Sequence, residues 1–199
     1  MKIVLATSNK GKIREIKAFL EGFDVVGFEE ALTPFEIDET GATFKENALI
    51  KARAVYEALP EKNTIVLSDD SGISVPLLGG EPGIYSARYA GIGASDKDNL
   101  TKLIATLSAR VVVQTPAFYT AAIALATPWG EFSVHGWMHG TAINEARGEN
   151  GFGYDPMFIP EGYTTTLGEM DAQAKRDISH RTQALKHAMT LLNTLKGNQ

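Results

Sequence analysis

Residues 2–20 read KIVLATSNKGKIREIKAFL, and this stretch decides how the beginning of the chain folds. The segment from Lys2 to Thr7 is a short apolar run rich in β-forming residues, which predicts a buried strand. Polar turn residues and a glycine follow, and after them apolar residues recur at helical spacing, at Ile13, Ile16, Phe19 and Leu20. The pattern predicts a strand, a turn and a helix, with the start of the helix at the tip of the strand.

The rest of the chain continues this alternation and then changes to a hairpin. Capping-box patterns open two of the expected helices, at Thr43 to Glu46 and at Ser95 to Asp98. The expected elements are a strand at 24–28, a helix at 44–59, a strand ending at 67, a helix at 96–107, two strands at 118–126 and 131–139, and a helix at 181–195. This order predicts a mixed-sheet α/β fold. Without repeats or linker-like stretches, we expect residues 1–199 to form a single domain.

Composition restricts the classes of protein to which the chain can belong. Of its 199 residues, 44% are hydrophobic and 22% charged, as is ordinary for a globular enzyme. The net charge of −5 argues against nucleic acid as a partner, so any cationic site for a polyanion must be local. The absence of cysteine excludes disulfides, thiolate ligands and cysteine nucleophiles. Because neither a signal peptide nor a membrane-spanning stretch is recognisable, we expect a cytoplasmic protein without a membrane partner.

The segment from Thr7 to Lys12 is a candidate anion-binding site. The N–H groups at the start of a helix lack partners, and the helix dipole favours negative charge there. The segment contains two lysines but lacks the glycine spacing of a P-loop. A simple helix cap with solvated lysines explains the same residues equally well.

The acidic pair Asp69-Asp70 is a candidate metal site, because it follows an apolar strand. Carboxylates at a strand end are well placed for an α/β active site, and Mg²⁺ prefers such oxygen ligands. An Asx-type turn explains the local pattern slightly better when it is taken alone. The earlier acidic loop with Glu36, Asp38 and Glu39 offers a further ligand, although a solvated loop is the simpler interpretation.

Two later segments contain groups that could recognise a nucleotide base. Residues 151–156 combine aromatic rings for stacking with glycines that permit close approach, but an aromatic core plug is a comparable alternative. Near the last helix, Ser179 is a plausible N-cap, and His180 and Arg181 could donate to keto or phosphate oxygens. A histidine at a helix start is also commonly just a surface residue.

The order of these segments is more specific than any one of them. They follow one another as Thr7-Ser8-Asn9-Lys10-Gly11-Lys12, Glu39-Thr40-Gly41 with residues 44–53, Asp69-Asp70-Ser71-Gly72, residues 83–88, residues 152–155, and Ser179-His180-Arg181. From residue 3 to about residue 195, this series closely resembles the inosine/xanthosine triphosphate pyrophosphatase family, the Ham1-like enzymes. The resemblance implies an elongated two-lobed mixed-sheet fold, a homodimer and Mg²⁺, with Mn²⁺ as a possible substitute. It also implies hydrolysis of ITP, dITP and XTP to the monophosphate and pyrophosphate, which removes deaminated purines from the nucleotide pool.

The resemblance also implies roles for individual residues. Asp70 would be the catalytic residue and a metal ligand, with Glu39 or Asp38 as the second ligand. The residues expected to bind substrate are Thr7, Ser8, Asn9, Lys10, Gly11 and Lys12 at the phosphates, Lys51 near the triphosphate, and Ser71, Phe152, Gly153, Tyr154, Asp155, Lys175, His180 and Arg181 around the remainder. One departure is Ser8, which stands where most members carry glycine. If the loop requires a positive φ there, serine would be strained.

Three alternative functions remain open at this stage. A related Maf-like pyrophosphatase would act on dTTP or UTP. A non-catalytic nucleotide-binding module would bind without releasing pyrophosphate. A phosphatase that cuts the γ-phosphate would release orthophosphate and a nucleoside diphosphate.

Overall fold

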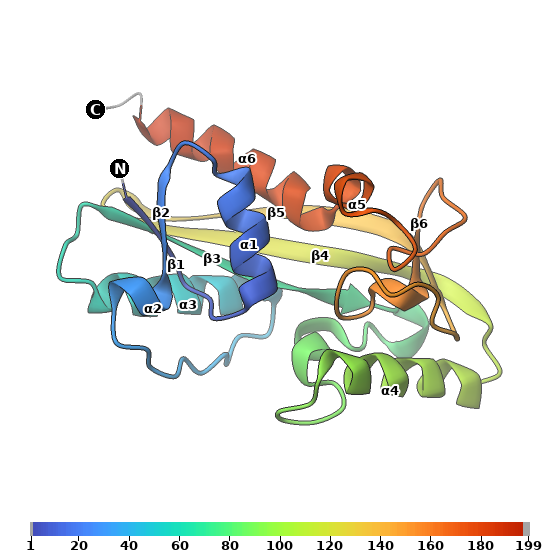
Figure 1. Ribbon diagram of the computed structural model, residues 1–199. Helices are drawn as coiled ribbons and strands as arrows, with labels where there is room; N and C mark the ends of the chain where they lie inside the picture. Colours follow the sequence, from blue (N-terminus) through green and yellow to red (C-terminus); the bar gives the residue numbers. More distant parts are fainter. Residues whose placement is uncertain (1, 197–199) are drawn as a thin grey trace. The chain divides into compact units, whose positions relative to one another are not determined.

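The computed structural model describes residues 2–196 and has a mixed α/β architecture (Figure 1). The strands of the described chain form one six-stranded sheet in the order β2-β1-β3-β4-β5-β6. Their bounds are β1 Lys2–Leu5, β2 Asp24–Gly27, β3 Thr64–Ser74, β4 Gln114–Thr127, β5 Gly130–Ile143 and β6 Phe158–Pro160. Strand β1 is parallel to β2 and β3, whereas β5 and β6 are antiparallel. The predicted mixed-sheet α/β class is therefore confirmed.

Helices α1 to α4 lie between these strands along the chain, and α5 and α6 follow the last strand. Their bounds are α1 Lys10–Phe19, α2 Phe28–Ala31, α3 Phe44–Ala58, α4 Asp96–Ala109, α5 Ala172–Ile178 and α6 His180–Lys196, with 3₁₀ helices η1 Pro76–Leu78, η2 Gly83–Arg88 and η3 Asp155–Met157. The long helices lie where the sequence predicts them, and so do the long strands except β3, which continues beyond its predicted end at residue 67. Elements α2, α5 and β6 are too short to show a periodic pattern. Among residues 2–196, no helix is both long and apolar enough to cross a bilayer.

The described residues divide into two compact units. The first unit lies within Met1–Asp70, Ala121–Gly136 and Gln183–Gln199, and the second comprises Ser71–Thr120 and Trp137–Thr182. The chain passes from one unit to the other at four places, and the first of them is the peptide bond that joins Asp70 to Ser71, inside β3.

The first unit has a separate core on each face of its part of the sheet. On one face, β3 residues Ile65 and Leu67 pack with buried side chains of α1 and α6. On the other face, Val66 packs with buried side chains of α2 and α3. Since successive residues of a strand point to opposite faces, a continuous apolar run suits a strand that is covered by helices on both sides.

The second unit has one core, in which α4 packs against the parts of β4 and β5 that belong to this unit. Leu103 and Leu107 from α4 lie with Tyr119, Met157 and Phe158, and Met157 is fully buried. The aromatic rings of Tyr119 and Phe158 meet edge to face at 4.9 Å between their centroids. These contacts pack 3₁₀ helix η3 and the short strand β6 into the core of this unit.

Gly72 of β3 lies where η2 touches the strand. The Ser86 hydroxyl accepts the Ile73 N–H at 3.0 Å and donates to the Gly83 carbonyl at 2.7 Å. A Cβ on Gly72 would lie 2.3 Å from Ser86 Oγ and 2.7 Å from the Gly83 carbonyl oxygen. A residue with a side chain therefore cannot replace Gly72 without moving η2.

We predict that Gly72→Ala lowers the free energy of unfolding by about 1–3 kcal/mol, because overpacking forces the neighbouring backbone to shift. Denaturant unfolding followed by circular dichroism measures the change. Gly27→Ala is the matched control, because its Cβ would meet only the flexible end of Glu30, at 3.1 Å. Equal losses in the two variants would contradict the close approach at Gly72.

Candidate functional site

The sequence suggested that the acidic pair follows the end of a strand, but the structure places the pair inside the strand. Strand β3 continues through Asp69 and Asp70 to Ser74, and both aspartates are buried. The expectation of a strand that ends at Leu67 is therefore wrong, and so is the alternative of an Asx turn. The pattern misleads because adjacent charges usually mark a solvated turn, whereas here each carboxylate has a cationic partner inside the fold.

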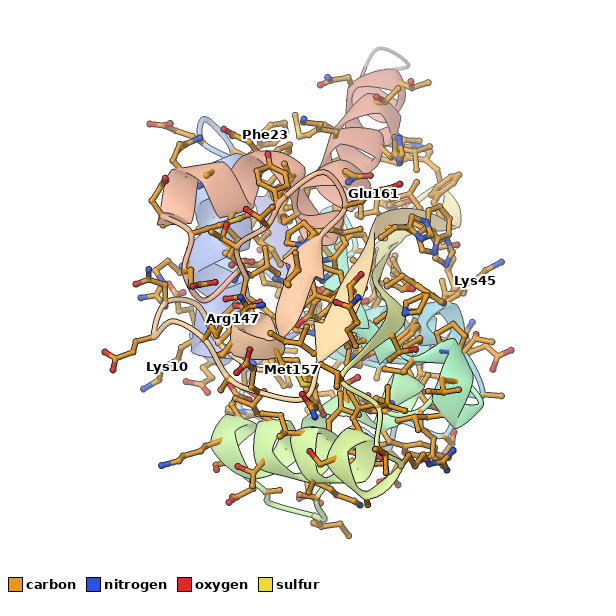
Figure 2. The ribbon with its side chains drawn as sticks, turned by 90° about the vertical axis from the view of Figure 1, so that its right-hand side faces the viewer. Lys10, Phe23, Lys45, Arg147, Met157 and Glu161 are labelled. Carbon is orange, nitrogen blue, oxygen red and sulfur yellow. The ribbon has the colours of Figure 1, made fainter. Side chains whose placement is uncertain are left out.

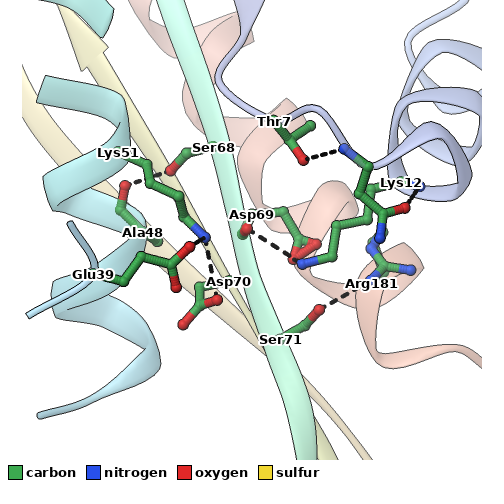
Figure 3. A network of polar contacts seen from close by, with 11 residues as sticks. Thr7, Lys12, Glu39, Ala48, Lys51, Ser68, Asp69, Asp70, Ser71 and Arg181 are labelled. Carbon is green, nitrogen blue, oxygen red and sulfur yellow. Dashed lines mark hydrogen bonds and ion pairs between the residues drawn. The ribbon is translucent and has the colours of Figure 1, made fainter. Parts of the chain in front are cut away.

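Alternation along β3 sends the two carboxylates to opposite faces of the sheet. Asp69 continues the row that contains Leu67 and faces α1, while Asp70 continues the row that contains Val66 and faces α3. The close-up in Figure 3 shows Lys12 and Lys51 approaching the strand from its two sides. Each aspartate is therefore paired with the covering helix of its own face.

Asp69 and Lys12 form a buried ion pair. Lys12 Nζ lies 3.2 Å from Asp69 Oδ1 and 3.4 Å from the Asp69 carbonyl oxygen. The Asp69 side chain is completely buried, and that of Lys12 is 15% exposed. The pair fixes the first turn of α1 against β3.

Lys51 of α3 lies between two carboxylates. Its Nζ atom is 3.2 Å from Asp70 Oδ1 and 3.1 Å from Glu39 Oε1. Burial opposes the charged ammonium, but Asp70, Glu39 and Asp69 outweigh this effect and raise the pKa of Lys51. Burial also raises the pKa of the Asp70 carboxyl, and the charges of Lys51 and Lys12 offset this only in part. One ammonium group thus serves two carboxyl groups, which leaves oxygen atoms in this set for a further cation.

The second oxygen of Asp70 fits a metal ligand. Asp70 Oδ2 is buried, and no donor within residues 2–196 hydrogen-bonds to it. In that same part of the chain, no three or more acidic, histidine or cysteine side chains are grouped to hold a metal by themselves. Mg²⁺ commonly uses one or two carboxylates and takes its other oxygens from water and phosphates. Asp70 and Glu39 together fit that donor set.

The structure separates the two candidates for the second metal ligand. Glu39 contacts Lys51, which also contacts Asp70, and the Glu39 side chain is 28% exposed. Asp38 is exposed, and its carbonyl oxygen accepts the Thr40 N–H at 3.1 Å. The geometry therefore brings Glu39 into the carboxylate set.

The segment from Thr7 to Lys12 forms the predicted turn and helix start. Asn9 is the N-cap of α1, and its side chain accepts the Lys12 N–H at 3.1 Å. Thr7 Oγ1 accepts the Asn9 N–H at 3.2 Å, and Gly11 lies in the first helical turn. Lys10 is exposed and points outward (Figure 2).

Ser8 causes no backbone strain. It is exposed at the turn, and within the described chain the only non-glycine residue with a positive φ is Val111. Serine therefore fits this position without the strain that the comparison with glycine suggested.

In the second unit, several predicted substrate residues form a connected cluster around Phe152. Arg181 Nη2 donates to Ser71 Oγ at 3.0 Å, and the Arg181 guanidinium lies 5.8 Å from the centre of the Phe152 ring. The Lys175 ammonium lies 4.4 Å from the same centre and 2.6 Å from Asp155 Oδ2. The Phe152 N–H also donates to Asp155 Oδ2, at 2.7 Å. An aromatic ring flanked by two cations suits a planar, polar ligand.

The remaining predicted residues of this unit are fixed by partners that the sequence did not reveal. The buried imidazole of His180 stacks on Tyr119, with 4.7 Å between ring centroids and an interplanar angle of 13°. The Tyr154 hydroxyl donates to the Ser86 carbonyl at 2.8 Å. The Gly153 N–H donates to Asp96 at 3.1 Å. Ser179 Oγ accepts the N–H of Thr182, which confirms the predicted cap at the start of α6.

The predicted site residues thus fall into two sets. The first unit holds Thr7, Ser8, Asn9, Lys10, Gly11, Lys12, Asp38, Glu39, Lys51 and Asp70, and the second holds Ser71, Phe152, Gly153, Tyr154, Asp155, Lys175, His180 and Arg181. Sequence reasoning missed the Asp69–Lys12 pair and the stacking of Tyr119 on His180. The alternation of β3 carried a signal for the first, whereas no sequence pattern indicated the second.

The mixed sheet covered by helices makes this an α/β protein, and its buried carboxylates paired with helix lysines form a candidate ligand site. Within that class, the chain belongs to the Ham1 family, whose model matches residues 3–191. It is 62% identical to the dITP/XTP pyrophosphatase of Nautilia profundicola over 98% of this chain and 99% of that protein. It is 58% identical to the enzyme of the same name from a Sulfurovum species, over 100% of this chain and 97% of that one. The solved structure of the Staphylococcus aureus Ham1 protein matches with a TM-score of 0.85 and 38% identity, over 100% of both chains.

We predict that Lys12→Met lowers the free energy of unfolding by about 3 kcal/mol, because it leaves the Asp69 carboxylate buried without its lysine. Lys17→Met on the same helix is the matched control, since its ion pair with Glu30 is exposed and should be worth less than about 1 kcal/mol. Urea unfolding measures both changes. Adding Asp69→Asn to Lys12→Met should recover part of the loss, and a similar small loss in both lysine variants would refute a buried pair.

Proposed function

We propose that this chain hydrolyses non-canonical purine nucleoside triphosphates, namely ITP, dITP and XTP, to the monophosphate and pyrophosphate. Its role is to remove deaminated purines from the nucleotide pool. The observation that carries the proposal is the set of two carboxylates, Asp70 and Glu39, around Lys51, in a member of the Ham1 family. The names of the relatives at 62% and 58% identity support this substrate class.

The phosphate chain is the part of the substrate that the first unit is suited to bind. A triphosphate carries about four negative charges, so catalysis of its hydrolysis is mostly positioning and charge neutralisation. The start of α1 offers main-chain N–H groups and the positive end of a helix dipole, next to Thr7, Ser8 and Asn9. Lys12 and Lys51 contribute positive charge from the two faces of β3.

Asp70 and Glu39 would hold Mg²⁺, or Mn²⁺ in its place. When it is bound, such an ion neutralises phosphate charge and polarises the phosphoryl oxygens. Asp70 acts as the catalytic residue by orienting the attacking water toward the α-phosphorus and accepting its proton. Burial raises the pKa of the Asp70 carboxyl, which makes it a better proton acceptor than an exposed aspartate.

The second unit supplies groups that distinguish a hypoxanthine or xanthine base from adenine. A donor to the 6-keto oxygen pairs with these bases, but adenine presents an amino group there and leaves the donor unpaired. His180 and Arg181 are suitable donors, and both are buried. Phe152 offers its ring for stacking, while Lys175, Asp155 and Tyr154 keep that segment in place.

The proposal also includes a homodimer in the cytoplasm. The family resemblance supports the dimer, and the composition without cysteine suits a reducing compartment. Sedimentation velocity of the purified protein measures the oligomeric state. A monomer at micromolar concentration would remove the dimer from the proposal without affecting the activity.

We predict that the purified protein with Mg²⁺ converts ITP, dITP and XTP to monophosphate and pyrophosphate, and that it spares ATP. Phosphorus NMR of the products distinguishes this reaction from γ-phosphate cleavage, which yields orthophosphate. Including dTTP and UTP tests the Maf-like alternative. Binding without turnover would support a non-catalytic module, and equal loss of every triphosphate would refute the specificity.

We predict that Asp70→Asn reduces turnover of ITP roughly 10³-fold or more, because the amide cannot accept the proton of the attacking water. Asparagine has nearly the same shape, so circular dichroism should show a retained fold. Near-normal ITP hydrolysis in this variant would remove Asp70 from its central role.

We predict that Glu39→Gln and Asp38→Asn, a matched pair of neighbouring substitutions, differ in the Mg²⁺ concentration that the variant enzyme requires. Glu39→Gln should raise the Mg²⁺ concentration for half-maximal turnover by about tenfold, since it weakens a ligand of the ion. Asp38→Asn should leave that concentration close to its normal value, because the Asp38 side chain is exposed. A titration of turnover against Mg²⁺ measures this concentration for each variant. A larger increase in Asp38→Asn than in Glu39→Gln would make Asp38 the second ligand.

A further inference from the structure

The loop that carries Glu39 is fastened to the start of α3 by two hydrogen bonds. This loop, residues 33–43, has no regular secondary structure. The Gly41 N–H donates to Asn47 Oδ1 at 2.8 Å, and the Ala42 N–H donates to Glu46 Oε2 at 2.6 Å. The first acceptor is buried and the second lies on an exposed residue, so the bond to Asn47 is the one protected from water.

The approach of Gly41 to the helix is too close for any side chain. A Cβ at this position would lie 2.6 Å from Glu46 Cβ, 2.7 Å from Asn47 Oδ1 and 2.9 Å from the Asn47 main-chain nitrogen. Position 41 therefore requires glycine, because there is no space for a Cβ between the loop and the helix. The loop backbone rests directly on the first turns of α3, two residues after Glu39.

If the Asn47 side chain served only the stability of the fold, it would be an unfavourable choice at this buried position. Asn47 is fully buried, and within residues 2–196 its Nδ2 atom has no hydrogen-bond acceptor. An unpaired buried donor typically costs about 1–3 kcal/mol, which an apolar side chain of similar size avoids. The bond from the Gly41 N–H is thus the specific contribution of this amide.

The position of Asn47 on α3 connects this bond to the carboxylate set. Asn47 lies four residues before Lys51, so both side chains project from the same face of the helix. Lys51 contacts the Glu39 carboxylate at 3.1 Å and the Asp70 carboxylate at 3.2 Å. One helix face therefore holds both the backbone of the Glu39 loop and the carboxylates.

We propose that Asn47 is a positioning residue, which holds the Glu39 loop on α3 so that the Glu39 carboxylate stays beside Asp70 in readiness for the metal. The inference rests on the proposed function, because it takes Glu39 as a metal ligand. Asn47 itself acts only through the loop backbone. Residues that orient the ligands of a metal often alter its affinity strongly when they are replaced.

The test compares Asn47→Leu, which removes the acceptor oxygen, with Asn47→Asp, which retains one. We expect Asn47→Leu to weaken Mn²⁺ binding about tenfold, measured by electron paramagnetic resonance without nucleotide, and to raise the Mg²⁺ midpoint of ITP turnover similarly. Turnover at saturating Mg²⁺ should fall much less. In the metal-free Asn47→Leu variant, the hydrogen of the Gly41 amide should exchange with deuterium faster than in the metal-free wild-type protein. Asn47→Asp should restore most of the metal affinity and of the protection at Gly41.

Asn99 of α4 provides the matched control. It is also buried, and it fastens a loop of the second unit by accepting the Ala90 N–H at 2.7 Å and donating to the Ala87 carbonyl at 3.1 Å. That loop carries no proposed metal ligand, so Asn99→Leu should lower stability without changing the metal midpoint. If Asn47→Leu does not fold, Asn47→Ala replaces it.

Two results would overturn the inference. One is an unchanged metal affinity in Asn47→Leu, whether or not the Gly41 amide exchanges faster. The other is a change of the metal midpoint in Asn99→Leu as large as that in Asn47→Leu. These failures are separate from a failure of the proposed function. A wild-type protein without ITP hydrolysis would refute that function, while Mn²⁺ binding and exchange at Gly41 would still report on the inference.

Discussion

Two adjacent carboxylates buried within one strand are the constraint on which this structure depends. A carboxylate inside a protein requires a nearby positive charge, because the loss of hydration would otherwise be too costly. Alternation along β3 turns Asp69 and Asp70 to opposite faces, so no single lysine serves both. The chain meets the requirement with Lys12 from α1 on one face and Lys51 from α3 on the other. The same ion pairs that make the buried strand tolerable also place the charged groups of the candidate site.

The second unit solves a different problem, which is to bring main-chain atoms close to polar side chains. Gly72 leaves room for the Ser86 hydroxyl, and Gly151 leaves room for Asp155, since a Cβ on Gly151 would lie 2.1 Å from Asp155 Oδ2. Asp155 in turn binds the Phe152 N–H and the Lys175 ammonium. Gly72 and Gly151 are therefore required by packing, because each stands where a polar side chain of a neighbouring segment approaches the main chain.

Much of the architecture could be predicted from local patterns, because these patterns act within a few residues. The capping residues Asn9, Thr43 and Ser95 begin helices where expected, and each accepts the main-chain N–H that its position predicts. The continuation of β3 could not be predicted in this way. The interpretation of Asp69-Asp70 as a turn or strand end depended on the two residues alone, whereas the strand depends on lysines 57 and 19 positions earlier.

The candidate site was predictable mainly as a list of residues, and less as an arrangement. The order of motifs indicated Asp70, Lys51 and Glu39, but it left Asp38 as an alternative to Glu39 for the second metal ligand. Only the folded loop shows that Glu39 reaches Lys51. The stacking of Tyr119 on His180 joins residues 61 positions apart, so no local pattern contains it.

The opposite orientations of Asp69 and Asp70 also limit how the gene for this protein can change. Replacing one apolar residue of β3 by another alters only local packing. Inserting or deleting a single residue between Thr64 and Leu67 would instead exchange the faces of every later side chain in the strand. Asp69 would then turn toward α3 and Asp70 toward α1, and both apolar rows would be inverted with them. Evolution can therefore revise the composition of this strand, but hardly its length.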